Sequence, residues 1–170
     1  PPATKGYPPS VFAAMPRLLE RAGTSNGPGV ITALYTVLVE GDDLSDPIAD
    51  AVRGILDGHI VLSRSLAERN HFPAIDVLSS ISRLAPEIAS EQNLRSAGVV
   101  RDMMSAYREA LDLIQVGAYV TGSDPRVDAA CAANPHIEQF LKQKTSDRTS
   151  LEEAQARLLK LAMLATAKSR

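Results

Sequence analysis

The acidic residues of one short stretch are candidates for metal chemistry, because carboxylates bind divalent cations. Glu40, Asp42, Asp43 and Asp46 fall within seven residues. Their spacing lacks the alternating ligands and the closing glutamate of a calcium-binding loop. Asp46 directly precedes Pro47, and this pair is typical of a helix N-cap followed by the first helical turn. We therefore expect a solvated turn and a helix cap here instead of a metal site.

The other groups that could bind a metal or attack a substrate stand apart in the sequence. They are His59, His71, Cys131 and His136. A metal site needs several such ligands at short spacings, and the sequence contains no such cluster. A single cysteine excludes an internal disulfide and is consistent with a reducing compartment. We expect Cys131, which lies in an alanine-rich segment, to be a small side chain of the core.

The composition is that of an ordinary folded protein. Of the 170 residues, 45% are hydrophobic and 22% are charged, which argues against disorder. A net charge of -2 gives no basic excess, so nucleic acid is not an expected partner. We see neither a signal peptide nor an apolar run of membrane-spanning length, and we expect a cytoplasmic protein. Because the chain begins Pro1-Pro2 without a methionine, we expect a fragment of a longer protein.

The first half of the chain predicts alternating helices and strands. Ser10 can cap a helix that runs to about Ala22 and is kinked or broken at Pro16. The apolar, β-branched run of residues 30–39 predicts a strand covered on both faces, as in a parallel sheet. Further predicted elements are a helix from Pro47 to Leu56, a strand at residues 59–62 and a helix at residues 63–69. This is part of a parallel sheet whose other strands must lie upstream.

After Pro86 the pattern is helical only. Apolar residues recur at helical spacing from Ser90 to about Gly117. A second helix is predicted from Asp124-Pro125 to Asn134-Pro135, and a third over residues 136–144. Ser150-Leu151-Glu152-Glu153 is a capping box that opens a last helix through Ala167. We therefore predict an α/β fold followed by an all-α part, with a boundary near Pro86.

Several strings of residues carry a more specific resemblance. These are residues 5–12 (KGYPPSVF), 36–43 (TVLVEGDD), 46–50 (DPIAD), 56–64 (LDGHIVLSR), 71–76 (HFPAID) and 80–83 (SISR). Together they resemble the flagellar and type III secretion export ATPases, which are relatives of the F-type ATP synthase catalytic subunit. The resemblance runs in order to about Lys144, and residues 145–170 are not covered by it.

The resemblance implies a domain organisation. Residues 1–85 would be the C-terminal portion of a RecA-like P-loop ATPase domain, and residues 86–170 a helical C-terminal domain. The cofactor would be ATP with Mg²⁺. The sequence contains no G-x-x-x-x-G-K-[ST] loop to hold the phosphates, so these ligands are expected upstream, and this chain alone is expected to be inactive.

The resemblance also implies a role for Arg83. In the family, the arginine that ends this string reaches into the adjacent subunit's site as an arginine finger. Phosphoryl transfer spreads charge over the equatorial oxygens, and a planar, always-charged guanidinium can neutralise it. From the residue type alone, an ordinary surface arginine at a domain boundary would be the simpler interpretation.

Two aromatic residues match the adenine pocket of the family. Phe72 falls at a position that is usually aromatic and packs on the adenine ring, where a flat apolar face accepts a base by stacking. A core or turn residue held by Pro73 is the alternative. Phe140 is a candidate second wall of the pocket, although its helical spacing with His136 and Leu141 also suits a core residue.

The remaining implications concern partners. The loop of Tyr119, Gly122 and Asp124 falls where synthase relatives contact the central stalk, so it would face the stalk protein of the export apparatus; a plain inter-helix turn is the alternative. The complete protein would be a homo-hexamer that meets export substrates and chaperones at the cytoplasmic face of the inner membrane.

Gly117-Ala118-Tyr119 favours the flagellar over the injectisome subfamily. A non-catalytic, truncated paralogue that docks into rings is the competing hypothesis.

Overall fold

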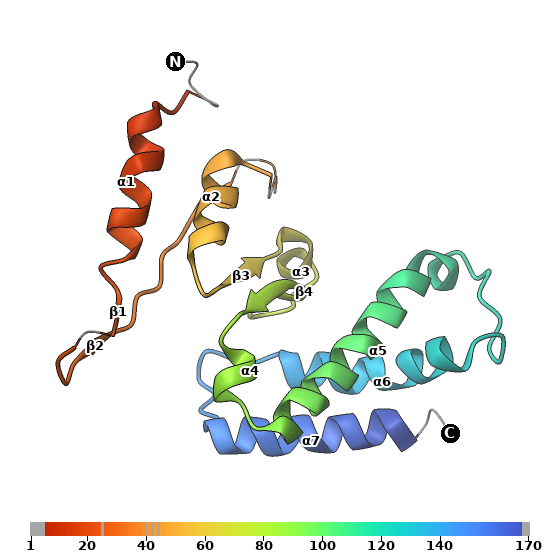
Figure 1. Ribbon diagram of the computed structural model, residues 1–170. Coiled ribbons are helices and arrows are strands. Elements are labelled where there is room, and N and C mark those ends of the chain that lie inside the picture. Colours follow the sequence, from red (N-terminus) through yellow and green to blue (C-terminus); the bar gives the residue numbers. More distant parts are fainter. Residues whose placement is uncertain (1–5, 25, 40, 42, 44, 168–170) are drawn as a thin grey trace. The chain divides into compact units, whose positions relative to one another are not determined.

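A computed structural model describes residues 6–24, 26–39, 41, 43 and 45–167, and its elements are labelled in Figure 1. The chain divides into two compact units, residues 1–59 and residues 60–170. Short strands and helices extend through Ser82, and only helices follow. This confirms the predicted fold class, an α/β part followed by an all-α part.

The first unit begins with α1 (Pro9–Leu19), which contacts α2 (Pro47–Ile55). Helix α1 starts after Pro8, and no side chain caps it, so the prediction that Ser10 is its cap is wrong. The predicted break at Pro16 does not occur either, since the helix continues to Leu19. Only one turn of the helix follows Pro16. The Pro16 carbonyl accepts a hydrogen bond from Glu20 N at 2.9 Å.

The predicted strand over residues 30–39 forms only at its start. β2 (Val30–Ile31) pairs antiparallel with β1 (Gly23–Thr24), and residues 32–39, all of them described, form neither helix nor strand. Leu34 and Leu38 are each 91% exposed. A strand needs hydrogen-bonding neighbours on its sides, and a two-stranded pair is marginal by itself. In the described part of the chain the apolar pattern of residues 32–39 finds no such neighbour.

Helix α2 begins as predicted. The Asp46 carboxylate accepts hydrogen bonds from the backbone N–H of Ile48 at 2.9 Å and of Ala49 at 3.4 Å. Asp43 accepts from Ser45 N at 3.0 Å. These carboxylates therefore serve caps and turns, while Glu40 and Asp42 lie outside the described residues.

Strand β3 (Gly58–Leu62) spans the division between the units, and the second unit continues with α3 (Arg64–Glu68) and β4 (Ile75–Ser82). Ser63 caps α3, and Asn70 has a φ of 57°, which asparagine tolerates better than most residues. β3 pairs with β4, a strand that the sequence pattern did not predict. The described strands thus form two separate two-stranded sheets, β1-β2 and β3-β4.

The rest of the unit is the short α4 (Ala85–Ile88) followed by three long helices that pack on one another (Figure 1). These are α5 (Glu91–Gln115), α6 (Pro125–Leu141) and α7 (Leu151–Ala167). Small residues fill much of their core, since Ala106 and Ala130 are fully buried. Alanine lets helices approach closely, with Ile137 and Leu161 filling the remaining space.

Proline does not end α6. We expected a helix up to Asn134 and a separate one from His136, but α6 runs through Pro135 to Leu141. An internal proline costs about 3 kcal/mol. Here Ala133 and Ile137, on either side of the proline, are both buried in the core. Their packing holds the helix together across the missing hydrogen bond.

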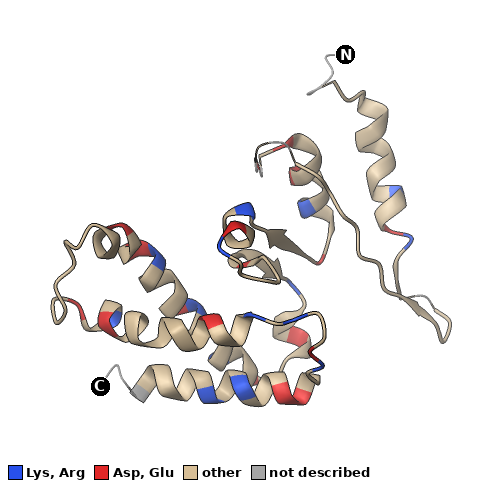
Figure 2. Ribbon diagram, turned by 180° about the vertical axis from the view of Figure 1, so that it is seen from behind, with Lys and Arg blue, Asp and Glu red and all other residues tan. Residues whose placement is uncertain are grey.

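The other helix ends follow the sequence. Ser90 caps α5, and Gly117 beyond it has a φ of 70°. Ser150 and Glu153 form the predicted capping box, with Ser150 N donating to Glu153 and Glu153 N donating to the Ser150 hydroxyl, each at 3.2 Å. Acidic and basic residues are interspersed over the helical bundle in Figure 2. No described helix is both long and apolar enough to cross a membrane.

Candidate functional site

Arg83 stands at the junction between strand and helix. It directly follows β4 and precedes α4, and its side chain is exposed. The flanking Ile81 and Leu84 are also exposed, at 50% and 40%. Arg83 thus lies at an exposed junction between a strand and a helix.

Phe72 lies in the turn between α3 and β4 and is 51% exposed. Its carbonyl accepts a hydrogen bond from Gln143 N at 2.9 Å, which brings this turn to the C-terminal end of α6. Phe140, in the last turn of α6, is half-buried and packs against the core of the bundle. The structure therefore brings the two segments together, while the Phe140 side chain makes the contacts that a core residue would make.

His71 is a buried member of this region that sequence reasoning did not select. Its side chain is only 7% exposed, and its backbone N–H donates to the Leu66 carbonyl at 2.9 Å. Burial and the positive charges of Lys142 and Arg69 lower the pKa of His71, against the opposing effect of Glu138. A buried imidazole with a lowered pKa thus directly precedes the exposed Phe72 in the chain.

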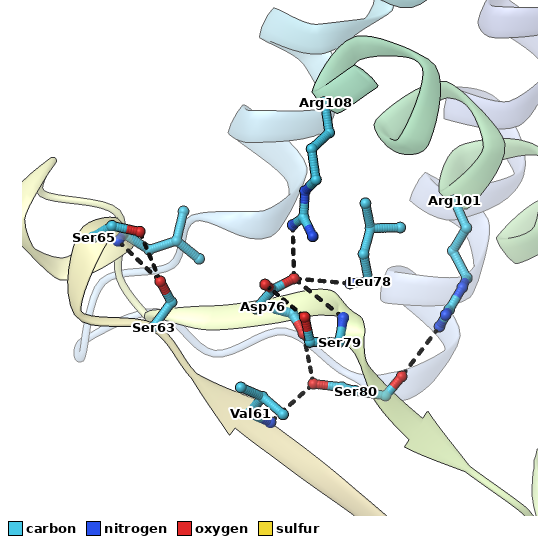
Figure 3. A network of polar contacts seen from close by, with 10 residues as sticks. Val61, Ser63, Ser65, Asp76, Leu78, Ser79, Ser80, Arg101 and Arg108 are labelled. Atoms are coloured by element: carbon cyan, nitrogen blue, oxygen red, sulfur yellow. Dashed lines mark hydrogen bonds and ion pairs between the residues drawn. The ribbon is translucent and has the colours of Figure 1, made fainter. Parts of the chain in front are cut away.

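Asp76, at the start of β4, is the centre of a polar network that the sequence also did not reveal (Figure 3). Its carboxylate pairs with Arg108 of α5 at 2.8 Å and accepts from the Ser79 hydroxyl at 2.8 Å. Burial alone would raise the pKa of Asp76, but the hydrogen bonds from Arg108 and Ser79 outweigh it and hold the pKa below its usual value. The two residues lie 32 positions apart in the chain. A single sequence does not reveal that they are in contact.

The loop between α5 and α6 is organised by an acid from outside it. The Asp128 carboxylate accepts from the Tyr119 hydroxyl at 2.9 Å and from Gly122 N at 2.8 Å. Asp124 caps α6 by accepting from Arg126 N at 2.8 Å. The pKa of Tyr119 is raised by desolvation of the Tyr119 hydroxyl and by its hydrogen bond to Asp128. The three residues selected from the sequence therefore belong to one ordered turn.

Cys131 is half-buried in α6, and burial raises the pKa of its thiol. Within the part of the chain that the structure describes, no group of three or more histidine, cysteine or acidic side chains is arranged to hold a metal ion.

Two protein-family models match the chain in succession. The ATP synthase alpha/beta family, nucleotide-binding domain, matches residues 1–82, and the T3SS EscN ATPase C-terminal domain matches residues 89–160. The chain is 57% identical over 162 residues to the flagellum-specific ATP synthase of Pseudomonas aeruginosa, covering 95% of this chain and 36% of that protein. It is 54% identical to the type 3 secretion system ATPase of Sinorhizobium fredii over 90% of this chain and 34% of that protein.

Solved structures give the same result. The assembled ATPase EscN from the type III secretion system of enteropathogenic E. coli superposes with a TM-score of 0.87 at 46% identity, covering 92% of this chain and 38% of that one. EscN in complex with its central stalk EscO superposes with a TM-score of 0.81 at 44% identity, covering 92% and 37%. The chain thus spans a little over a third of the length of the proteins it matches.

Proposed function

Because the chain belongs to the family of flagellar and type III secretion export ATPases, we propose that it forms the C-terminal part of a subunit that couples ATP hydrolysis to flagellar protein export. The observation that carries the proposal is the match, in order, to a nucleotide-binding domain over residues 1–82 and to an export-ATPase C-terminal domain over residues 89–160. The sequence Gly117-Ala118-Tyr119 supports the flagellar system over the injectisome. We propose a boundary between the nucleotide-binding and helical domains near Pro86, with residues 1–85 before it and 86–170 after it.

Within this function, Arg83 acts as an arginine finger in trans. Its exposed position beyond β4 supports this role, since the side chain has to leave its own subunit. The guanidinium would meet negative charge that develops on the transferred phosphoryl group, and such a finger accelerates the reaction about 10³–10⁵-fold. ATP and Mg²⁺ would be held by upstream residues, because these 170 residues contain no phosphate-binding loop. We therefore propose that the chain alone does not hydrolyse ATP.

The other residues contribute binding surfaces. Phe72, which is half-exposed, would stack on adenine, and Phe140 would form a second wall of that pocket. The ordered turn of Tyr119, Gly122 and Asp124 would contact a central stalk protein inside a homo-hexamer. Export substrates and their chaperones would be further partners, with the ring placed at the cytoplasmic face of the inner membrane.

The test is steady-state ATP hydrolysis by the complete subunit, under conditions where rings assemble. Arg83→Ala is expected to lower kcat about 10³-fold or more with KM for ATP nearly unchanged, because the lost interaction exists only in the transition state. Arg83→Lys should recover little, since an ammonium cannot replace the planar fork. Arg95→Ala, which removes another exposed arginine, is the control. Wild-type kcat in Arg83→Ala rings would leave the finger assignment without support.

A non-catalytic, truncated paralogue is the alternative. The coding sequence immediately before Pro1 distinguishes the two: an in-frame G-x-x-x-x-G-K-[ST] motif supports the motor subunit, and a start codon at that point supports the paralogue.

A further inference from the structure

The network around Asp76 shapes the strand that leads to Arg83 (Figure 3). The Asp76 carboxylate accepts from the backbone N–H of Leu78 at 3.1 Å and of Ser79 at 3.2 Å. The Ser80 hydroxyl donates to the Asp76 carbonyl at 2.6 Å. In an extended strand, residues four apart are separated by about 13 Å, at roughly 3.3 Å per residue. β4 must therefore bend between Asp76 and Ser80, three residues before Arg83.

The bend is tied to the neighbouring strand and to helix α5. The Ser80 hydroxyl accepts from Val61 N of β3 at 2.9 Å. From α5, Arg108 pairs with the Asp76 carboxylate at 2.8 Å, and Arg101 donates to the Ser80 carbonyl at 3.5 Å. The two arginines are seven residues apart, two helical turns, and so lie on one face of α5. They contact the two ends of the bend.

The two contacts from α5 differ in strength. The bond from Arg101 is long and therefore weak. The Asp76 side chain is only 17% exposed, whereas that of Arg108 is 52% exposed. Removing the guanidinium would leave a mostly buried carboxylate without its cation, which is the costly way to break an ion pair. The geometry of the bend therefore depends mainly on the ion pair between Arg108 and Asp76.

We propose that Asp76 and Arg108 are positioning residues for Arg83. They hold the bend of β4 against α5 and so fix the direction in which the strand presents Arg83 to a neighbouring subunit's nucleotide. This inference rests on the proposed function of Arg83. Bulges and bends of this kind recur beside active sites, where they direct a side chain. A displacement of about 1 Å in a catalytic group can reduce the rate up to about 10²-fold.

The experiment compares ATP hydrolysis by the complete subunit and its variants in assembled rings. Arg108→Gln is expected to lower kcat about tenfold, less than loss of the finger itself, with KM for ATP changed by less than about twofold. Arg108→Lys should restore most of kcat, because Arg108 makes a single bond to Asp76 that an ammonium can replace. This is the opposite of the expectation for Arg83→Lys. The matched control is Arg95→Gln on the same helix, whose partner Glu91 is exposed, and which should leave both constants unchanged.

A double-mutant cycle with Asp76→Asn tests whether the two residues act as one unit. If they do, adding Arg108→Gln to Asp76→Asn causes little further loss. Asp76→Asn keeps an acceptor oxygen for the backbone N–H groups of Leu78 and Ser79. If Arg108→Gln fails to assemble into rings, Asp76→Asn is tested in its place, with the same expected changes in kcat and KM.

The outcomes separate this inference from the proposed function. Wild-type kcat in Arg108→Gln alongside an inactive Arg83→Ala overturns the positioning role and leaves the finger in place. Wild-type kcat in Arg83→Ala overturns both. A rise in KM without a change in kcat, or failure of Arg108→Lys to restore activity, also overturns the positioning role.

Discussion

Residues 30–39 and the three-helix bundle α5–α7 both carry many apolar residues, but they bury them to different degrees. Leu34 and Leu38 are almost fully exposed, whereas Ala106, Ala130 and Ile137 are at most 2% exposed. A helix satisfies its backbone hydrogen bonds internally, so three helices suffice to enclose a core. A strand depends on neighbours for those bonds. The three helices therefore enclose a core among themselves. Residues 32–39 have the apolar pattern of a strand but no neighbouring strand in the described part of the chain.

The largest expected difference between these regions is in backbone protection. In the 170-residue chain, amide hydrogens in the middle of α5 and α7 should exchange at least about 10³-fold more slowly than those of residues 32–39, because only the former require the core to open. Hydrogen–deuterium exchange followed by mass spectrometry measures both in one sample. Equal protection, or better protection across residues 1–84 than across 90–144, would contradict the comparison.

Truncation of one apolar side chain in each region is the next test. Ile137→Ala should reduce the free energy of unfolding by about 2–5 kcal/mol, because it leaves a cavity among α5, α6 and α7. Leu34→Ala, its matched control, should change it by less than about 0.5 kcal/mol, since that side chain is already in water. Urea unfolding monitored by circular dichroism provides both values. A similar cost for the two would show that Leu34 is buried in solution.

The helix caps extend the comparison at a smaller scale. Ser150→Ala should reduce the free energy of unfolding of the bundle by about 1 kcal/mol, because α7 loses its N-cap. Asp46→Ala removes the cap of α2, which belongs to the other unit, and should leave the unfolding transition of the bundle in place. A shift of that transition by Asp46→Ala equal to that by Ser150→Ala would mean that the two units unfold together.

The smallest effect is a pH dependence confined to the second unit. The pKa of His71 is lowered from 6.5 in the folded chain, so below pH 6.5 the unfolded chain binds more protons. The free energy of unfolding should therefore fall as the pH is lowered through 6.5, and level off below the folded-state pKa. His71→Gln should remove this component, seen as a difference between the two pH profiles. Identical profiles would show that His71 is solvated in the folded state.

Local signals in the sequence predicted much of this fold. The cap at Asp46, the helix start at Asp124-Pro125 and the capping box at Ser150 are side-chain-to-backbone bonds within three residues, and all are present in the structure. One local signal failed, since Ser10 does not cap α1. Other failures depended on distant residues. Pro135 stays within α6 because the core on both sides of it outweighs a local preference. β4 is a strand through its partner β3, and the pairing of Asp76 with Arg108 joins positions far apart in the chain.

The candidate site shows the same division. The positions of Arg83 and Phe72 were selected through matched strings of neighbouring residues, and both side chains are exposed. His71, Asp76 and Asp128 were not selected, because their importance lies in burial and in partners that a single sequence does not display.

Complementation in mixed rings tests whether Arg83 acts on the nucleotide of a neighbouring subunit. Two variants of the complete subunit are combined, Arg83→Ala and a substitution in the phosphate-binding loop, each inactive by itself. In a randomly mixed, head-to-tail ring, about a quarter of the interfaces join an intact loop to an intact Arg83. If Arg83 acts in trans, ATP hydrolysis should recover toward that fraction of the wild-type rate. Absence of any recovery in rings shown to contain both subunits would contradict it.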